Sequence, residues 1–340
     1  MGSILRRMLV IIAGCIVAFP GYARQQDGSL GLVLTPNNGV PALVTAGGVF
    51  RAELAQKASL SLVRDGNSRP ITAEWHEIPG GHVEAVCTVP ADLAKGAYML
   101  SAEISGSTDQ NERSVWVWDR FPEYYVLAHL TDVHIGRKDA APGPELTLQK
   151  ILENVNASDT VLTAITGDLT DTGSAEQFQE FLRLINTCTT PTIVCPGNHD
   201  RNADHYEKYF GPLTYRFTFG RDGYLAFDTK DYVTADDLGG QSGRLQEYRR
   251  EIKPCRWSIG LTHRYEPTMG MRAQLTLFVD EPLDFLLIGH IHRELEKDEG
   301  IPWGKTMAIA TPASLDGRFR FIDVTAQGLL PRPVTSVLEP

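Results

Sequence analysis

The 340-residue sequence is poor in cysteine and in positive charge. None of its five cysteines has CxxC spacing, which argues against a zinc site built from thiolates. The net charge of −10 disfavours nucleic acid as a sequence-blind polyanionic partner, because that binding mode needs a basic surface. Internal repeats and low-complexity tracts are also lacking. What remains is a globular composition, 42% hydrophobic and 22% charged, in a chain long enough for two domains.

Long hydrophobic runs are scarce as well, and the most sustained one lies at the N-terminus. Residues 1–23 have the parts of a signal peptide: the basic pair Arg6 and Arg7, the apolar stretch Met8 to Phe19, and the cleavage site Gly21-Tyr22-Ala23. This stretch is short for a bilayer span and no other segment is longer, so no transmembrane segment is predicted. We therefore predict an exported protein, periplasmic or secreted, whose mature chain has a net charge of about −12.

A lipoprotein signal is the alternative for the same segment. Ile12-Ala13-Gly14-Cys15 resembles a lipobox, whose cysteine is acylated. Hydrophobic residues continue past Cys15 to Phe19, where a lipoprotein normally turns polar, so anchoring at Cys15 is the less favoured interpretation. Removal of the leader leaves four cysteines: Cys87, Cys188, Cys195 and Cys255. An oxidising compartment permits disulfides among them without fixing which of them pair.

Residues 28–120 show short β-rich runs broken by turns such as Asp65-Gly66-Asn67. Six strands are predicted, at Gly48 to Leu54, Ser59 to Val63, Ile71 to Glu77, Val83 to Val89, Ala97 to Ile104 and Arg113 to Trp118. Their spacing of about ten residues predicts a small antiparallel, immunoglobulin-like β-sandwich. Its His76 and His82 are expected to be ordinary polar surface residues.

After Phe121-Pro122 the period changes, and residues 124–335 alternate strand and helix patterns. The predicted strands are Tyr124 to Thr131, Thr160 to Thr166, Pro191 to Cys195, Tyr224 to Asp228, Trp257 to Thr262, Phe285 to Ile288, Met307 to Ala310 and Phe319 to Val324. Helices are predicted from Leu146 to Val155, from a capping box at Ser174 and Gln177, and from Gly239 to Ile252. Stacked βα units of this kind indicate an α/β domain.

Five polar clusters follow the ends of these strands. They are Asp132-Val133-His134, Gly167-Asp168, Gly197-Asn198-His199-Asp200, His263 and Gly289-His290-Ile291-His292. Because open α/β sheets bind ligands at the carboxyl edge of their strands, we expect these side chains to meet. The i, i+2 spacing of Asp132 and His134, repeated in His290 and His292, lets both members of a pair project to one side of a strand end. Glycines before three of the donors let the backbone bend tightly.

Seven residues of the clusters are suitable metal ligands: Asp132, His134, Asp168, Asn198, His263, His290 and His292. Mn²⁺, Fe²⁺ and Zn²⁺ accept carboxylate oxygen and imidazole nitrogen, and a two-metal site needs a carboxylate that can bridge. Five of the nine histidines fall inside the clusters, which favours a metal centre over scattered structural roles. We predict two divalent ions, each Mn, Fe or Zn.

The five clusters, in this order, resemble the motifs of the calcineurin-like metallophosphoesterase family, which are D-x-H, GD, GNHD or GNHE, H and GHxH. The resemblance covers Val126 to about Val324 and is greatest to the cyclic-nucleotide phosphodiesterase branch. It implies a four-layer α/β/β/α sandwich, so the predicted fold class is α/β with a small all-β sandwich before it. By analogy, one metal takes Asp132, His134, Asp168 and His292. The other takes Asp168, Asn198, His263 and His290, with Asp168 as the bridge.

The resemblance also implies roles for the neighbours of these ligands. His199 faces the substrate, where it stabilises charge or protonates the leaving oxygen, and Asp200 orients it. Asn198 and Arg201 are further candidates for substrate contact, with a surface salt bridge as an equal alternative for Arg201. The related purple acid phosphatases have a tyrosine where this chain has Asp171, so a ferric tyrosinate site is disfavoured and Asp171 is expected to support the loop. His129 and His205 are expected to be structural.

The predicted function is hydrolysis of small phosphate mono- or diesters by an exported dinuclear-metal enzyme. A metal-bridging hydroxide attacks phosphorus, because metal binding lowers the pKa of water from about 15.7 towards about 7. One alternative is a cyclic-nucleotide phosphodiesterase. Another is a non-catalytic, metal-stabilised binding module at the cell envelope, with the β-sandwich holding the partner. No nucleic-acid polymer is expected as a partner.

Two segments are predicted to form the lip of the active site, Asp204 to Thr218 and Tyr265 to Met271. They contain the aromatic residues Tyr206, Tyr209, Phe210 and Tyr265. These rings are available to stack on a base or sugar, or to pack beneath a loop.

Overall fold

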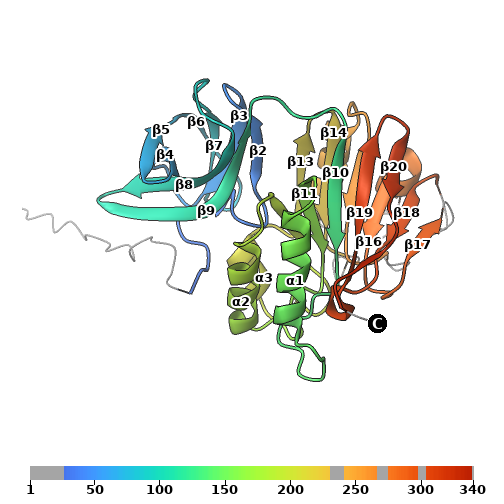
Figure 1. The fold of residues 1–340 in the computed structure, drawn as a ribbon. Coiled ribbons are helices and arrows are strands. Elements are labelled where there is room, and N and C mark those ends of the chain that lie inside the picture. The colour runs from blue at the N-terminus through green and yellow to red at the C-terminus, as the bar shows by residue number, and fades with distance from the viewer. Residues whose placement is uncertain (1–26, 230–240, 266–274, 298–303, 339–340) are drawn as a thin grey trace, which may run out of the picture.

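The computed structural model describes residues 27–229, 241–265, 275–297 and 304–338. The predicted leader 1–23, the start of the predicted helix from Gly239 and most of the lip segment from Tyr265 lie outside the described residues. Figure 1 shows an N-terminal all-β region beside a larger region of mixed strands and helices. None of the helices in the described ranges combines the length and apolar character needed to cross a membrane.

The N-terminal region consists of two β-sheets. The first has the order β1 (Val33–Thr35), β3 (Val49–Leu54), β7 (Val83–Thr88) and β6 (Thr72–Glu77). The second has the order β2 (Ala42–Thr45), β9 (Ser107–Trp118), β8 (Gly96–Ile104), β4 (Ser59–Arg64) and β5 (Asn67–Pro70). Alternate residues of β3, namely Phe50, Ala52 and Leu54, are buried, which is the pattern of a strand with one face in a core.

The six strands predicted in this region are confirmed, and the short strands β1, β2 and β5 were not predicted. The predicted strands pair antiparallel, as expected, whereas the additional strand β2 runs parallel to β9. His76 is exposed, and His82 Nδ1 lies 2.7 Å from Glu53 Oε1, as expected for surface histidines.

The mixed region is built on two six-stranded sheets. The first has the order β12 (Thr192–Cys195), β11 (Thr160–Thr166), β10 (Tyr125–Leu130), β19 (Arg318–Thr325) and β20 (Gly328–Pro331), with β21 (Thr335–Ser336) paired to β19. The second has the order β13 (Thr214–Phe219), β14 (Asp222–Phe227), β15 (Ser258–Leu261), β16 (Phe285–Ile288), β18 (Met307–Ala310) and β17 (Leu295–Lys297). Strands β12, β11 and β10 of the first sheet are parallel to one another, as are β14, β15, β16 and β18 of the second, so the carboxyl ends of each set share an edge.

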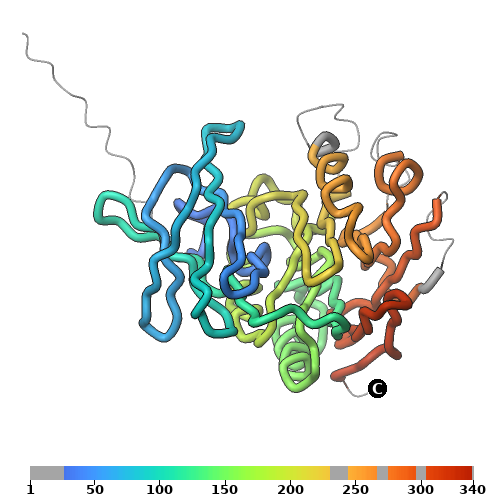
Figure 2. The backbone as a smooth tube through the Cα atoms, turned by 90° about the horizontal axis from the view of Figure 1, so that it is seen from above, coloured from blue at the N-terminus to red at the C-terminus, as the bar shows by residue number. Residues whose placement is uncertain are grey.

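Helices lie on both outer sides of these strands. Helix α1 (Pro144–Asn156) and α4 (Gln241–Ile252) are on opposite sides in Figure 2, with the strands between them. Helix α2 (Ala175–Ile185) packs against α1 and against α3 (His205–Phe210), whereas α4 packs against β13, β14 and the short helix η2 (Thr276–Asp280). The described part of the chain beyond residue 120 is therefore a mixed α/β fold with several sheets.

The predicted cap of α2 is half confirmed. The Ser174 hydroxyl accepts a hydrogen bond from the Gln177 backbone N–H at 3.4 Å. The Gln177 side-chain oxygen accepts from the Thr172 backbone N–H at 2.8 Å instead of returning to Ser174. The capping box thus lacks its reciprocal half, and Gln177 orders the loop before the helix.

The prediction of a lip from Asp204 to Thr218 was wrong. This segment forms α3 and β13, and Tyr206, Tyr209 and Phe210 are no more than 2% exposed. Their i, i+3, i+4 spacing is that of the buried stripe of a helix, and the rings pack against Phe178. They are therefore core residues and cannot stack on a substrate. Of the second segment, Tyr265 lies in the described part, with its ring 5.7 Å from that of Phe278.

The N-terminal region is joined to the first sheet along the edge strand β12. Gly39 forms a parallel bridge with Ile193, and its carbonyl accepts a hydrogen bond from the Val194 N–H at 2.9 Å. The Asn38 side-chain oxygen accepts from the Thr192 hydroxyl at 2.7 Å. The segment before β2 thus continues the sheet beyond its last strand.

Candidate metal centre

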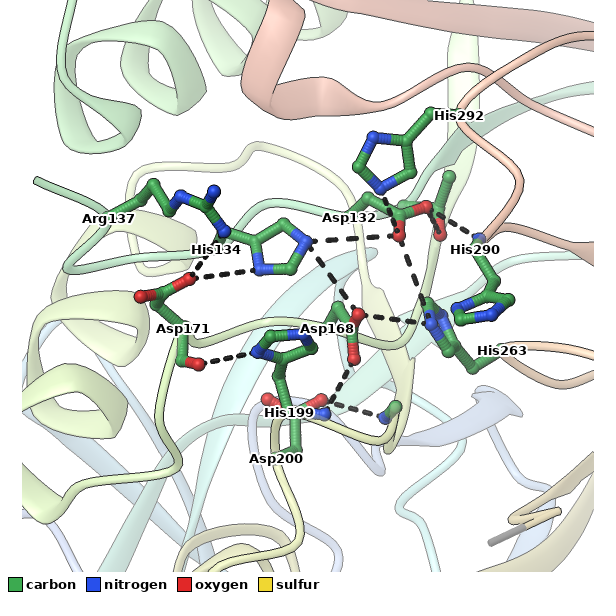
Figure 3. Close-up of polar contacts among 12 residues, drawn as sticks. Asp132, His134, Arg137, Asp168, Asp171, His199, Asp200, His263, His290 and His292 are labelled. Atoms are coloured by element: carbon green, nitrogen blue, oxygen red, sulfur yellow. Dashed lines mark hydrogen bonds and ion pairs between the residues drawn. The ribbon is translucent and has the colours of Figure 1, made fainter. Parts of the chain in front are cut away.

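The five polar clusters meet at the carboxyl edge shared by the two sheets. Three follow the first-sheet strands β10, β11 and β12, and two follow β15 and β16 of the second sheet. Figure 3 shows that the histidines from both sheets surround Asp132 and Asp168. The side chains that the sequence places at five separate strand ends are therefore brought together.

Five of the predicted ligands have left-handed backbone conformations, with φ of 52° at Asp132, 53° at His134, 48° at Asp168, 66° at His290 and 53° at His292. The pairs are therefore not on extended backbone; Asp132 and His134 still share one donor group as predicted, whereas His290 and His292 belong to different groups. A left-handed residue with a side chain costs about 1–2 kcal/mol, and such residues persist where the surroundings determine the backbone. Here the Asp132 N–H donates to the Gly167 carbonyl at 3.1 Å and the His134 N–H to the Asp168 carbonyl at 2.9 Å.

The glycines before the ligands are required by close packing. Gly167 is itself left-handed, with φ of 79°, and a Cβ there would overlap the His263 ring. At Gly289 a Cβ would overlap Thr131 and the Asp132 carboxylate. Glycine therefore lets neighbouring loops approach closely enough for their donors to converge.

The donor atoms form three overlapping groups, within each of which all donors lie within 4.8 Å of one another. They are Asp132, His134 and His292; His134, Asp168 and His199; and Asp168, His263 and His290. Asp168 belongs to two groups, as a bridging carboxylate must. His199, predicted to face substrate, also lies within reach of one group.

Each carboxylate has one oxygen fixed by the backbone and one facing the histidines. Asp132 Oδ2 accepts the His290 N–H at 2.8 Å, and its Oδ1 lies 3.1 Å from His292 Nε2. Asp168 Oδ1 accepts the His199 N–H at 2.9 Å, and its Oδ2 lies 3.1 Å from His263 Nε2. The backbone bonds therefore orient the oxygens that would bind a cation.

The charges of this cluster perturb one another strongly. Burial by itself raises the pKa of Asp168 and lowers that of His263, but their mutual contact outweighs burial in both cases. The pKa of Asp168 falls to about 2, and the pKa of His263 rises to about 9. Burial by itself would raise the pKa of Asp132, but the nearby His292 and His263 outweigh burial, so the pKa of Asp132 lies below its usual value. Both buried carboxylates are thus anionic and depend on nearby positive charge.

The hydrogen bonding of the ligand residues also leaves atoms available for metal ions. Three buried atoms, Asp132 Oδ1, His134 Nδ1 and His263 Nε2, lie within ion-pair distance of an opposite charge but make no hydrogen bond with the described residues. Such atoms are rare in native structures because leaving them unsatisfied costs about 1–3 kcal/mol each. His263 Nδ1 lies 3.0 Å from the Thr166 carbonyl and donates to it, which leaves Nε2 as the ligand atom. Divalent ions at this position are the partners that the donor set calls for.

The partner of His199 differs from the predicted one. Its Nδ1 donates to the Asp171 carbonyl at 2.6 Å. Asp200 is fully buried and accepts bonds from the backbone N–H groups of Leu169, Thr170 and Gly197 and from the Thr170 hydroxyl. The prediction that Asp200 orients His199 was therefore wrong, because the carboxylate is fully used in tying the GNHD loop to the GD loop. Burial and the charge of Asp168 raise the pKa of Asp200 to about 6.

Asp171 supports the site as predicted, and it does so through both its backbone carbonyl and its side-chain carboxylate. In addition to its carbonyl bond to His199, its Oδ1 lies 3.4 Å from His134 Nδ1 and 3.4 Å from Arg137 Nη1. Arg137 was not predicted, because it lies outside the D-x-H motif and no spacing signal identifies it. Figure 3 places it on the outer side of His134, away from His263.

The other residues singled out from the sequence lie in different surroundings. Asn198 is half-buried in the same loop as His199, which keeps its predicted roles open. Arg201 Nη1 lies 2.9 Å from Glu207, and its Nε lies 3.2 Å from Asp228, so its guanidinium has the salt-bridge role that was the alternative to phosphate contact. His129 is fully buried between the hydroxyls of Thr166 and Thr311, and His205 Nδ1 bonds the Gly173 carbonyl. The four cysteines of the described chain are free.

Comparison with known proteins supports the interpretation of this centre. Residues 125–294, half of the chain, match the family described as calcineurin-like phosphoesterase. A probable cyclic nucleotide phosphodiesterase of Vesicomyosocius okutanii is 25% identical over 122 residues, which are 34% of this chain and 52% of that protein. A probable glycerophosphodiester phosphodiesterase of Arcobacter nitrofigilis is 26% identical over 113 residues, 32% of this chain and 40% of that protein. The chain thus spans about half the length of these curated relatives or less.

Among solved structures, a purple acid phosphatase from yellow lupin seeds has a similar fold, with a TM-score of 0.52 and 13% identity. The likeness covers 81% of this chain and 67% of that one. At this identity it concerns the fold alone.

Proposed function

The chain belongs to the calcineurin-like phosphoesterase family, and from this premise we propose that it is an exported two-metal hydrolase of small phosphate mono- or diesters. Metal-dependent hydrolysis of phosphate esters, the compartment and the substrate are all parts of this proposal. The observation that carries it is Asp168, whose carboxylate belongs to two donor groups at once. One group includes His134 of the first sheet, and the other includes His263 and His290 of the second sheet. Two ions bound there would lie at one carboxylate, between the sheets.

In the proposed reaction, water adds to phosphorus and the bond from phosphorus to the alcohol oxygen breaks. Bound divalent ions supply Lewis-acid neutralisation of the phosphate charge and lower the pKa of water to about 7. Asp132, Asp168, His263 and His292 would hold these ions through the oxygens and nitrogens that the backbone already orients. By holding the ions, the buried carboxylates would determine where the phosphate of the substrate binds.

His199 is the residue proposed to act on the leaving group. Its Nδ1–H is fixed by the Asp171 carbonyl, so Nε2 is the nitrogen that can carry and release a second proton. A proton donated from Nε2 to the leaving oxygen would neutralise the alkoxide as the phosphorus–oxygen bond breaks. The backbone carbonyl of Asp171, and not the Asp200 carboxylate, sets the orientation of the ring.

A cyclic-nucleotide phosphodiesterase is the second candidate. The similarity to a probable cyclic nucleotide phosphodiesterase supports it, at 25% identity over about a third of this chain. An exported enzyme would meet little intracellular cyclic nucleotide, which favours other phosphate esters for this chain. The two candidates share the same centre and differ in the pocket around the leaving group.

The alternative of a non-catalytic binding module is disfavoured by His199. A protein that used metals only for stability would have no need of a histidine oriented by a carbonyl beside the metal donors. Export through residues 1–23 rests on the sequence pattern, as does anchoring at Cys15 as the lesser alternative. An immunoglobulin-like origin of the N-terminal sheets and a role for them in envelope association belong to the same proposal.

The test is hydrolysis of bis(p-nitrophenyl) phosphate and p-nitrophenyl phosphate by metal-stripped protein to which Mn²⁺, Fe²⁺, Zn²⁺ or Mg²⁺ is restored singly. Turnover should return with metal, and it should be lost in Asp168→Ala. Asp65→Ala, which removes an exposed aspartate of a hairpin turn, is the matched control and should keep full turnover. The ratio of diester to monoester rates separates the substrate classes. Turnover that survives both metal removal and Asp168→Ala would overturn the proposal.

A further inference from the structure

A cavity of about 560 Å³ opens beside the metal centre. Its size falls within the range of about 300–1,000 Å³ that is typical of small-molecule pockets. The lining combines charged and apolar side chains: Arg137, Asp139, Leu315, Asp316, Arg318 and Leu338. It is therefore suited to a small polar molecule.

The backbone connects this cavity directly to the predicted ligands. The Arg137 N–H donates to the His134 carbonyl at 3.0 Å, and the Leu315 N–H donates to the Asp132 carbonyl at 3.0 Å. The cavity wall thus begins at residues hydrogen-bonded to two predicted ligands. Figure 3 places Arg137 on the side of His134 that is remote from His263 and His290. The cavity therefore adjoins the loops that carry Asp132 and His134.

The two arginines of the cavity differ in their electrostatic partners. Arg137 Nε lies 2.6 Å from Asp139 Oδ1, and its Nη1 lies 3.4 Å from Asp171, so its charge is largely compensated. Arg318 is half-buried, and its side chain makes no ion pair or hydrogen bond with any residue that the structure describes. Arg201, the arginine predicted to contact substrate, is itself paired with Glu207 and Asp228.

Arg318 is also held in place by its backbone. It begins β19 directly after Gly317, whose left-handed φ of 69° turns the chain out of the short helix η3 (Ser314–Asp316). It pairs with Ser336 of β21 on the other side. The backbone of Arg318 is thus fixed, and its guanidinium has the fork of N–H donors that suits a carboxylate or phosphate.

We propose that the cavity receives the leaving group of the phosphate ester, and that its natural leaving groups are alcohols carrying a second anionic group that binds Arg318. The inference rests on the proposed phosphoesterase function and specifies its substrate class. A carboxylate and a second phosphate share the chemistry that Arg318 recognises. Cyclic nucleotides, which have one phosphate, lack such a group.

The test compares three esters that differ in the second group: glycerol 3-phosphate, 3-phosphoglycerate and glycerol 1,3-bisphosphate. Their methyl diesters replace them if the enzyme acts on diesters alone. The wild-type kcat/KM should be at least about tenfold higher for one or both anionic probes than for glycerol 3-phosphate, as charge-assisted bidentate binding provides. Whichever probe is preferred identifies the carboxylate or the phosphate as the recognised group.

Two Arg318 variants and one control assign that preference to the side chain. Arg318→Met should bring the ratio of kcat/KM values close to one, and Arg318→Lys should retain part of the preference. Arg69→Met, which removes an exposed arginine of β5 in the N-terminal region, should keep the wild-type ratio. An enzyme that hydrolyses the esters without preference, or a preference that persists in Arg318→Met, would overturn the subsite and leave the phosphoesterase intact.

Asp316→Asn provides a test of opposite sign, which holds even if Arg318→Met fails to fold. Asp316 is exposed on the same cavity, so removal of its negative charge should raise the preference for the anionic probes. A merely structural disturbance would not increase it, and an unchanged or lower ratio in folded Asp316→Asn contradicts the assignment. Wild-type protein that hydrolyses neither these probes nor the nitrophenyl esters with any metal would overturn the phosphoesterase function itself.

Discussion

Two buried polar clusters connect the two sheets of the mixed region, and they differ in whether their aspartate is satisfied. Asp222, at the start of β14, accepts from Arg256 through both carboxylate oxygens, at 2.9 and 2.6 Å, and from the Tyr125 hydroxyl at 3.0 Å. At the opposite end of β10, Asp132 Oδ1 and His263 Nε2 have close ion-pair contacts but make no hydrogen bond with the described residues. A cluster whose aspartate is fully hydrogen-bonded fixes packing, whereas one whose aspartate keeps an oxygen without a hydrogen bond is suited to bind a ligand.

The largest effect should come from the metal cluster and should appear in catalysis. We expect His199→Ala to lower kcat about 10²–10⁴-fold, the usual contribution of a general acid, while both metals stay bound. Steady-state kinetics with metal analysis measures both quantities. His82→Ala, a surface histidine of the N-terminal region, should leave both unchanged. Full activity in His199→Ala with metal retained would remove the role proposed for this residue.

The satisfied cluster should respond in stability instead. Asp222→Asn leaves the buried Arg256 guanidinium without its counter-charge, and we expect a loss of about 3 kcal/mol in the free energy of unfolding. Urea denaturation gives the value. Activity per folded molecule should stay at the wild-type level, since Asp222 lies at the end of the sheets remote from the donors. A loss of activity in folded Asp222→Asn would show that the two clusters are coupled.

Metal should stabilise the protein through one cluster alone. At a free Mn²⁺ concentration of 100 times Kd, each site should add about 2.7 kcal/mol to the free energy of unfolding. Thermal denaturation with and without chelator measures this gain. We expect Asp222→Asn to keep the gain and Asp168→Ala to lose most of it. An equal gain in both variants would place the bound metal elsewhere.

The last effect concerns pH, and it is about as large as the gain from one bound metal. Burial holds the pKa of His129 at about 3, below its ordinary value, so between pH 3 and 6.5 the unfolded chain binds a proton that the folded chain does not. This contribution therefore makes stability rise with pH, by up to about 1.4 kcal/mol per unit, and adds nothing further above pH 6.5. The difference in unfolding free energy between wild type and His129→Asn, measured from pH 4.5 to 7, isolates the slope. A constant difference over that range would contradict the burial of a neutral imidazole, and His205→Asn serves as the control.

The sequence predicts which residues form this centre better than it predicts their backbone conformation. The donors are visible because each follows an apolar strand, and Asp132, Asp168 and His263 converge as expected. Their left-handed backbone is not visible, because it is imposed by bonds from other loops, such as that from the Asp132 N–H to the Gly167 carbonyl. The carbonyl that orients His199 is hidden for the same reason, since every residue has a carbonyl and no side chain marks the one that is used.

Local patterns also conceal contacts that span the chain. The aromatic residues of α3 follow a helical period, yet the segment was predicted to form a substrate lip. Strand β13 alternates in burial as a hairpin partner of β14, but its first residues fall within that predicted lip. The cavity around Arg318 combines residues near positions 137, 316 and 336, whose spacing contains no motif. These features follow from tertiary packing, which single-sequence patterns do not encode.

The bridge between Gly39 and Ile193 has a consequence for solubility. Strand β12 is the last strand of its sheet, and an edge strand offers unpaired N–H and C=O groups to other chains. Gly39 occupies that position, with the Phe210 ring so close that no side chain fits there. The segment before β2 thus shields a border where two molecules could otherwise join strand to strand. The small β-region therefore covers an edge through which its larger neighbour could otherwise aggregate.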